Sequence, residues 1–497
     1  MTTLSPLITA TTLYNFVQCP KRVHLDYCGD PSEKDPPNAF VEMLWERGTL
    51  YEKEVFGGGE REFLDLSHVG GEEKERLTLE AMQRGERLIY NGRITSGDLL
   101  GIPDLLRRQG SGYIPIDIKS GRGKEDGGDD ADGKPKLHYA VQLALYVDIL
   151  EQLGQSSGRR GYIFDVHANE IEYDLETSRG KRITKTLWEE YQGALNEARR
   201  IANGHHDPRG ALASACKLCH WHSHCSRSLR ESNDLTLIPG LGRAIRDSLA
   251  EEFPTIDDLA QCNPEAYISD GNTPFYRVGQ TSLKKFHARA RLLTEHDAKP
   301  YLKAPVILPS TELELFFDIE VDPLRDHTYL HGFVERRGGD NSTERFIAFF
   351  TEAETAGAER AAFARSIDYM TADASASIWY YSKYERTIYR KLQSQYPDVC
   401  SAELIEHLFD PAHSIDLYND VVTKATEWPT NDHSIKSLAK HLGFEWRDTN
   451  PSGAASIQWF DEWVRTRNPA IRERILAYNE DDCRATRVLL DGIRRLS

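Results

Sequence analysis

Apolar and polar positions follow two distinct patterns along the chain. Short apolar runs typical of strands cover residues 99–106, 112–119, 312–320 and 377–381. Helical periodicity covers residues 138–150, 433–443 and 475–486. A polar stretch at 226–234 and a proline-containing stretch at 298–310 interrupt these patterns. We therefore predict an α/β multidomain chain, with domains over residues 1–230, 231–305 and 306–497.

Length and charge narrow the class of protein. The 497 residues fit about three domains of ~150 residues each. We find neither an apolar stretch long enough for a membrane span nor a signal-peptide pattern, so we expect a cytoplasmic protein without membrane contact. Lysine and arginine number 61 against 78 acidic residues, a net charge of −17. This balance excludes a surface that coats nucleic acid throughout, and any such contact must be local.

Carboxylates gather near the predicted strands of the first domain. Asp104 lies within the apolar run 99–106, and strand alternation places Asp117 and Lys119 on one face. Two such carboxylates can hold Mg²⁺, while the lysine can orient water and offset charge in a transition state. This arrangement favours hydrolysis of phosphodiester bonds.

Further residues can complete this site. Gln142 and Tyr146, four residues apart, share one helix face, and Glu52 on an amphipathic stretch can supply another metal ligand. The ordered set resembles the RecB-like branch of the PD-(D/E)XK nucleases over roughly residues 10–230. The resemblance implies a restriction-endonuclease-like domain that hydrolyses DNA. Many relatives have histidine where this chain has Glu52.

A cysteine cluster closes the first domain. Three cysteines have the spacing C-x2-C-x5-C, which is typical of metal ligands: Cys216, Cys219 and Cys225. Cys19, which opens the same domain, is the candidate for a fourth ligand. The layout resembles the iron-sulfur subgroup of RecB-like nucleases and implies a 4Fe-4S cluster. The alternatives are unligated thiols and a zinc site that uses a neighbouring histidine: His220, His222 or His224.

Glycine turns between short helices mark the middle segment, 231–305. Residues 237–242 and the helical pattern after them resemble a helix-hairpin-helix, whose glycines let backbone amides approach a phosphate. A weaker hairpin begins at Val278 and continues into a locally basic stretch, 283–291. We therefore expect a DNA-binding linker that contacts the backbone. The alternative is a plain pair of interdomain helices.

The C-terminal domain holds a second set of carboxylates. Asp318 and Glu320 share one face at the end of a strand, and Tyr478 and Asp482 share one face of a distant helix. A further helix begins near Glu385. Four carboxylates around two Mg²⁺ ions would activate a water, and Tyr478 could position it.

This order resembles the DEDD exonucleases of the RNase H-like superfamily, in their tyrosine-type variant, over roughly residues 311–497. The resemblance implies Mg²⁺- or Mn²⁺-dependent exonuclease action on DNA with 3′-to-5′ polarity. The middle motif departs from its usual form, so Glu385 is our candidate for the middle carboxylate and Asp416 the reserve. For Ser434 and Lys436, on the helical pattern 433–443, we favour a surface helix face; the alternative is an approach to the active site.

Together these patterns predict two metal-dependent nuclease domains joined by a helical linker. The whole arrangement resembles RecB-like nucleases with a C-terminal RNase H-like domain. The expected partner is DNA, as single strands or duplex ends. No G-x-x-x-x-G-K-[ST] motif occurs, so any unwinding would need a separate helicase. Two alternatives stay open: a nucleic-acid-binding or scaffold protein with one or both sites inactive, and an RNase.

Overall fold

A computed structural model gives the fold of two compact units, Met1–Ser228 and Leu229–Ser497. It describes residues 6–37, 63–119, 121–125, 133–166, 169–178, 180, 183–323, 325–449 and 451–496. The segment expected as a separate linker lies in the second unit. Within the described residues no helix combines the length and apolar character needed to cross a membrane.

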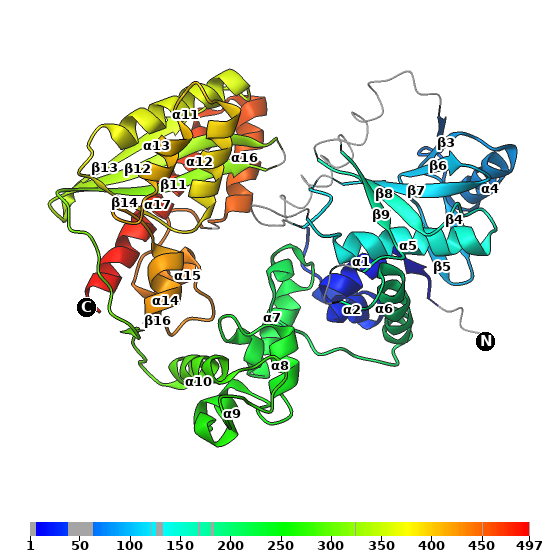
Figure 1. The fold of residues 1–497 in the computed structure, drawn as a ribbon, viewed down its shortest axis with the longest axis horizontal. Helices are drawn as coiled ribbons and strands as arrows, with labels where there is room; N and C mark the ends of the chain where they lie inside the picture. Colours follow the sequence, from blue (N-terminus) through cyan, green and yellow to red (C-terminus); the bar gives the residue numbers. More distant parts are fainter. Residues whose placement is uncertain are drawn as a thin grey trace. The chain divides into compact units, whose positions relative to one another are not determined.

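A six-stranded sheet in the order β2-β3-β6-β7-β8-β9 forms the centre of the first unit (Figure 1). Its strands are β2 (Leu64–Asp65), β3 (Leu88–Tyr90), β6 (Leu105–Gln109), β7 (Gly112–Ile118), β8 (Arg160–Phe164) and β9 (Glu170–Asp174). Every residue of β7 is buried. Ile116 and Ile118 pack on one face of the sheet, while Tyr113 joins the core under α5 (Leu137–Gln152) on the other. Strand alternation therefore directs Asp117 towards α5.

Smaller elements complete the first unit. A three-stranded sheet has the order β1-β5-β4, with β1 (Ile8–Thr9), β5 (Leu99–Gly101) and β4 (Ile94–Ser96). Among the described residues the other α-helices are α1 (Ala10–Gln18), α2 (Pro20–Cys28), α4 (Gly71–Arg84) and α6 (Leu187–Ala202), and α7 (His222–Glu231) runs across the boundary between the units. Thr9 caps α1 by accepting a hydrogen bond from the backbone of Thr12 at 3.0 Å. The cap fixes where α1 begins, and α1 then packs on α5 and α6.

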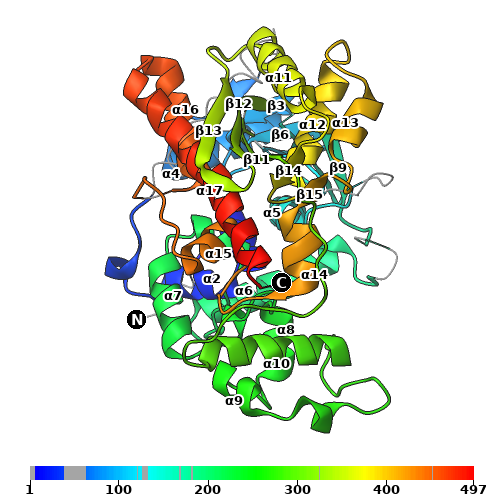
Figure 2. The same ribbon diagram turned by 90° about the vertical axis from the view of Figure 1, so that its left-hand side faces the viewer.

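The second unit contains a five-stranded sheet in the order β13-β12-β11-β14-β15. These strands are β11 (Leu313–Asp322), β12 (His327–Arg337), β13 (Asp340–Phe350), β14 (Ser377–Tyr380) and β15 (Ser414–Asp416). Strand β11 runs antiparallel to β12 and parallel to β14. The sheet lies between two groups of helices, as Figure 2 shows. One group is α11 (Ala356–Thr371), α12 (Tyr384–Gln395) and α13 (Ala402–Leu408); the other includes α15 (Ile435–His441), α16 (Gly453–Thr466) and α17 (Pro469–Arg494).

Alternation along β11 determines where its carboxylates point. Leu315 and Phe317 pack against α11 and α12, whereas Phe316 packs against α17. Asp318 and Glu320 lie on the same face of β11 as Phe316, so they face α17. Helix α17 is much longer than the helix expected over residues 475–486.

The segment before the sheet is helical and is tied to the rest of the second unit. It contains α8 (Arg243–Leu249), α9 (Ile256–Gln261) and α10 (Gln280–Thr294); then β10 (Tyr301–Leu302) pairs with β16 (Thr426–Glu427), next to α14 (Thr423–Ala425). Arg289 of α10 binds Glu427 at 2.7 Å and donates to the Pro239 carbonyl at 2.7 Å. Both charged side chains are buried. The prediction of a basic binding stretch over 283–291 is therefore wrong for Arg289, because its side chain is buried and its charge is paired with Glu427.

Candidate active sites

Three carboxylates from β11 and α17 converge in the second unit. Candidate donor oxygens of Asp318, Glu320 and Asp482 all lie within 4.8 Å of one another. A search of the described residues for three or more clustered metal-ligand side chains gives this group. With Tyr384 and Tyr478 they line a cavity of about 290 Å³. Hard oxygen donors at this spacing fit a divalent cation such as Mg²⁺ or Mn²⁺.

The electrostatics of this cavity support the same fit. Burial and the neighbouring Asp482 raise the pKa of Glu320 to about 8. Burial, together with the charges of Asp482 and Glu320, raises the pKa of Asp318 well above its usual range. A divalent cation would relieve the repulsion between these carboxylates. The cluster is therefore more favourable with a bound cation than without one.

Each carboxylate also accepts a hydrogen bond from a neighbouring side chain. Asn479 donates to Asp318 at 2.7 Å, Tyr329 to Glu320 at 3.3 Å, and Trp446 to Asp482 at 2.8 Å. Such donors hold metal ligands in one orientation. The sequence patterns identified none of the three, because Tyr329 and Trp446 come from other segments and Asn479 resembles an ordinary polar helix residue.

Lys436 enters this site as well. Its Nζ donates to Tyr478 Oη at 2.8 Å and lies 3.7 Å from Asp482 Oδ1. The favoured prediction of a surface face is therefore wrong for Lys436, and the alternative of an approach to the active site agrees with the structure, since α15 packs against α17 and this side chain reaches Tyr478 and Asp482. Ser434 instead caps α15, accepting from the backbone of Ser437 at 3.2 Å.

Glu385 lies beside the three carboxylates without joining the close group. It is buried at the first turn of α12 and accepts a hydrogen bond from Ser382 at 3.2 Å. Burial is the main reason that the pKa of Glu385 rises to about 8. Its charge also helps to raise the pKa of Asp318. Asp416, the reserve candidate, accepts both the backbone and side-chain N–H groups of Asn419, at 2.9 and 2.7 Å.

The first unit brings together Asp104, Asp117 and Lys119. Lys119 Nζ lies 2.9 Å from Asp117 Oδ2, and Asp117 is only 2% exposed. Asp104 Oδ2 accepts the backbone N–H of Ile118 at 2.6 Å, which holds it beside β7. Burial acts to lower the pKa of Lys119, but the charges of Asp117 and Asp104 outweigh it and raise this pKa above its ordinary value. The lysine therefore stays charged.

Helix α5 supplies the other two predicted residues. Tyr146 hydrogen-bonds to Asp117, and its pKa is raised by burial and then by that carboxylate. Gln142 is buried, and its Oε1 has no hydrogen-bond partner among the described residues. Gly101 makes room for Tyr146, because a Cβ there would lie 2.6 Å from the tyrosine ring. Glu52 lies outside the described residues.

The four predicted cysteines interact with one another. Burial raises the pKa of Cys225 to about 12, and the nearby Cys19, Cys219 and Cys216 contribute to the rise. Two of the candidate histidines have carboxylate partners. His220 lies 2.6 Å from Asp26, and His224 pairs with Glu33.

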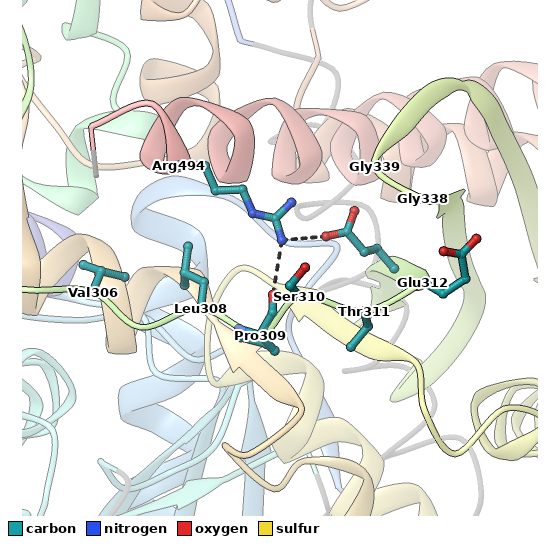
Figure 3. Close-up of a pocket in the computed structure, with 10 residues that line it drawn as sticks. Val306, Leu308, Pro309, Ser310, Thr311, Glu312, Gly338, Gly339 and Arg494 are labelled. Carbon is teal, nitrogen blue, oxygen red and sulfur yellow. Dashed lines mark hydrogen bonds and ion pairs between the residues drawn. The ribbon is translucent and has the colours of Figure 1, made fainter.

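A larger cavity of about 590 Å³ lies at the opposite end of β11 (Figure 3). Arg494 binds Glu314 there at 2.7 Å and donates to the Pro309 carbonyl at 3.3 Å (Figure 3). Glu314 also binds Arg336 at 2.7 Å. Glu314 and Arg336 are buried, Arg494 is partly exposed, and Asp491 also pairs with Arg336, at 3.0 Å. The charges at this cavity are therefore paired, and they form a structural ion-pair network rather than a reactive group.

Family models match the two parts of the chain that contain these sites. Residues 9–226, which contain Asp104 and Asp117, match the PD-(D/E)XK nuclease superfamily. Residues 315–493, which contain Asp318 and Asp482, match the RNase_H superfamily. The resemblances to the PD-(D/E)XK and RNase H-like superfamilies that were stated from the sequence are thereby confirmed. The chain therefore contains a domain of the PD-(D/E)XK nuclease superfamily followed by a domain of the RNase_H superfamily, and this architecture supports a metal-dependent nuclease.

Proposed function

We propose that this protein is a Mg²⁺- or Mn²⁺-dependent deoxyribonuclease with two active sites, and that its C-terminal site is a 3′-to-5′ exonuclease. The observation that carries the proposal is the convergence of Asp318, Glu320 and Asp482 in one cavity. A divalent cation held by these residues would activate water and stabilise the leaving oxygen.

At the C-terminal site, the chain's own side chains would orient the attacking water. Lys436 donates to Tyr478, whose hydroxyl also hydrogen-bonds to Asp482. Burial and then the charge of Asp482 raise the pKa of Tyr478, so its hydroxyl stays protonated. Tyr478 can thus orient a water by accepting one of its hydrogens, without acting as a base.

At the N-terminal site the roles fall on Asp104, Asp117 and Lys119. The two carboxylates are the candidate ligands, with Tyr146 fixing Asp117 from α5. The charged Lys119, 2.9 Å from Asp117, can stabilise negative charge on the phosphate undergoing attack.

Cavity size supports an exonuclease at the C-terminal site. The volume of about 290 Å³ is at the small end of ligand pockets, which span about 300–1,000 Å³. Such a cavity suits a single terminal nucleotide better than a duplex. DNA as substrate, and the 3′-to-5′ direction, rest on the resemblance to the tyrosine-type DEDD exonucleases. A helix-hairpin-helix formed by residues 237–242 and the helical pattern over 243–253 would add backbone contacts, and a separate helicase would supply single strands.

We also propose that Cys19, Cys216, Cys219 and Cys225 hold a 4Fe-4S cluster. Cys19, Cys216 and Cys219 all contribute to the raised pKa of the Cys225 thiol, as is expected of four thiols near one centre. The choice of iron-sulfur over zinc rests on the resemblance to the iron-sulfur subgroup of RecB-like nucleases.

End-labelled single-stranded DNA tests the nuclease proposal. Wild type, Asp117→Asn, Asp318→Asn and the double variant are incubated with Mg²⁺ or Mn²⁺, beside a matched RNA. We expect each single variant to retain cleavage and the double variant to lose it, and mononucleotide release from the 3′ end in Asp117→Asn. Release from the 5′ end would contradict the polarity, and preference for RNA would contradict the substrate. Equal inactivity of wild type and double variant would leave a nucleic-acid-binding protein.

Metal analysis after anaerobic purification tests the cysteine cluster. We expect iron, inorganic sulfide and a broad visible absorption band in wild type, and their loss in Cys225→Ser. Cys262→Ser is the matched control, because Cys262 lies outside the cluster. Stoichiometric zinc without iron would replace the iron-sulfur assignment.

A further inference from the structure

Asn479 is fully buried where α17 packs on strands β11 and β12. It lies on α17 between Tyr478 and Asp482 and has 0% exposed surface. Its Nδ2 donates to Asp318 Oδ2 at 2.7 Å. One oxygen of Asp318 is thereby engaged, while the same residue lines the cavity with Glu320 and Asp482.

Gly332 of β12 makes this position of Asn479 feasible. Gly332 is directly opposite Asp318 in the sheet register. A Cβ at residue 332 would lie 1.6 Å from Asn479 Oδ1 and 2.8 Å from its Cγ. Any side chain larger than hydrogen would therefore overlap with the amide.

The helix cannot easily retreat to make room. Cys483, one turn after Asn479, is fully buried and donates to the Gly332 carbonyl at 3.4 Å. Phe346 closes another side, 3.2 Å from the same Cβ position. An added methyl group would therefore displace the Asn479 amide rather than α17, and the amide would lose its bond to Asp318.

Stability alone does not explain an asparagine here. Its Oδ1 is buried without a hydrogen-bond partner in the part of the chain that the structure describes. An unpaired buried acceptor is destabilising, so an apolar residue would suit the packing better. The benefit of the amide lies in the hydrogen bond to Asp318.

We propose that Asn479 and Gly332 act together as a positioning pair that holds Asp318 in the orientation needed for binding a divalent cation. Asn479 supplies the hydrogen bond, and Gly332 supplies the space for it. Neither residue contacts the substrate, so both are positioning residues. The inference rests on the proposed function of this site but concerns metal affinity, which is measured without a substrate.

Calorimetric titration with Mn²⁺ tests the pair. The full chain carries Asp117→Asn, which removes a candidate ligand of the N-terminal site, and Asp318→Asn in addition identifies the signal of the C-terminal site. We expect Asn479→Ala to weaken Mn²⁺ binding at that site about 10- to 100-fold, as is typical when a metal ligand loses its orienting partner. We expect a similar loss for Gly332→Ala, and no change for Gly357→Ala, whose Cβ would meet nothing within 4 Å.

The double variant Gly332→Ala/Asn479→Ala makes the test decisive. Removing the amide opens the space that the new methyl group needs, so we expect the double variant to bind Mn²⁺ as Asn479→Ala does. Losses that multiply would overturn the proposal, as would wild-type affinity in Asn479→Ala. If Gly332→Ala does not fold, Asn479→Leu, which has a similar size and no donor for Asp318, must weaken binding in its place. DNA cleavage by the parent is assayed separately: Mn²⁺ binding without cleavage would contradict the proposed function and leave the positioning pair intact.

Discussion

Replacing Lys436 by methionine tests the electrostatic account of the C-terminal site. The substitution keeps the aliphatic stem and removes both the donor to Tyr478 and the charge 3.7 Å from Asp482. For that distance Coulomb's law gives ~4.5 kcal/mol at an effective dielectric constant of about 20, and ~1 kcal/mol in water. The Lys436 side chain is 33% exposed, so screening reduces the interaction to an intermediate value, ~2 kcal/mol. A loss of that size in the transition state lowers kcat about 30-fold.

The metal requirement separates this role from metal binding. Lys436→Met removes a positive side chain from the site, so it cannot weaken the attraction of the carboxylates for Mn²⁺. We therefore expect the cleavage rate to reach half of its maximum at an equal or lower Mn²⁺ concentration. The assay is release of 3′-terminal nucleotides in the Asp117→Asn background across a Mn²⁺ titration. Lys440→Met, exposed on the same helix, is the control. A wild-type rate, or a loss that excess Mn²⁺ fully restores, would refute the reasoning.

Three further predictions follow from other parts of the chain. Because burial raises the pKa of Glu385 from 4.5 to about 8, metal-free protein should lose stability as the pH rises through this interval. Glu385→Gln should then raise the free energy of unfolding by up to ~4 kcal/mol near pH 8 and change it little near pH 4, measured by thermal unfolding in EDTA; a lower melting temperature near pH 8 would contradict this. Lys119→Met in the Asp318→Asn background should lower the remaining cleavage rate by roughly 10²- to 10³-fold without unfolding the protein, and unchanged kinetics would exclude Lys119 from the reaction. Arg289→Met should cost about 3–5 kcal/mol of stability in denaturant titration, and adding Glu427→Gln should recover part of it; two independent losses would argue against the buried ion pair.

Local sequence patterns were enough to place the main carboxylates. Alternation in β11 puts Asp318 and Glu320 on one face, and helical spacing in α17 does the same for Tyr478 and Asp482. These relations depend only on the geometry of one element. The strand and helix around Asp117 and Tyr146 were predictable for the same reason.

Contacts between distant segments were not predictable in this way. The periodicity of α15 is compatible with Lys436 on the surface, and only the packing on α17 turns it towards Asp482. Arg289 resembles part of a basic surface until the chain returns 138 residues later with Glu427. No sequence motif identifies Asn479, because its role depends on Gly332, a distant residue on strand β12.

The contribution of α17 has a consequence for changes in chain length. A single helix supplies Tyr478, Asn479, Asp482 and Cys483 to the same region of the sheet. Deleting one residue upstream of them within the helix would rotate all four by about 100° and shift them by about 1.5 Å. Point substitutions there remove one contact at a time, whereas an insertion or deletion would remove every one at once. Variation in length should therefore be tolerated in the loops that border α17 and not between Asn468 and Tyr478.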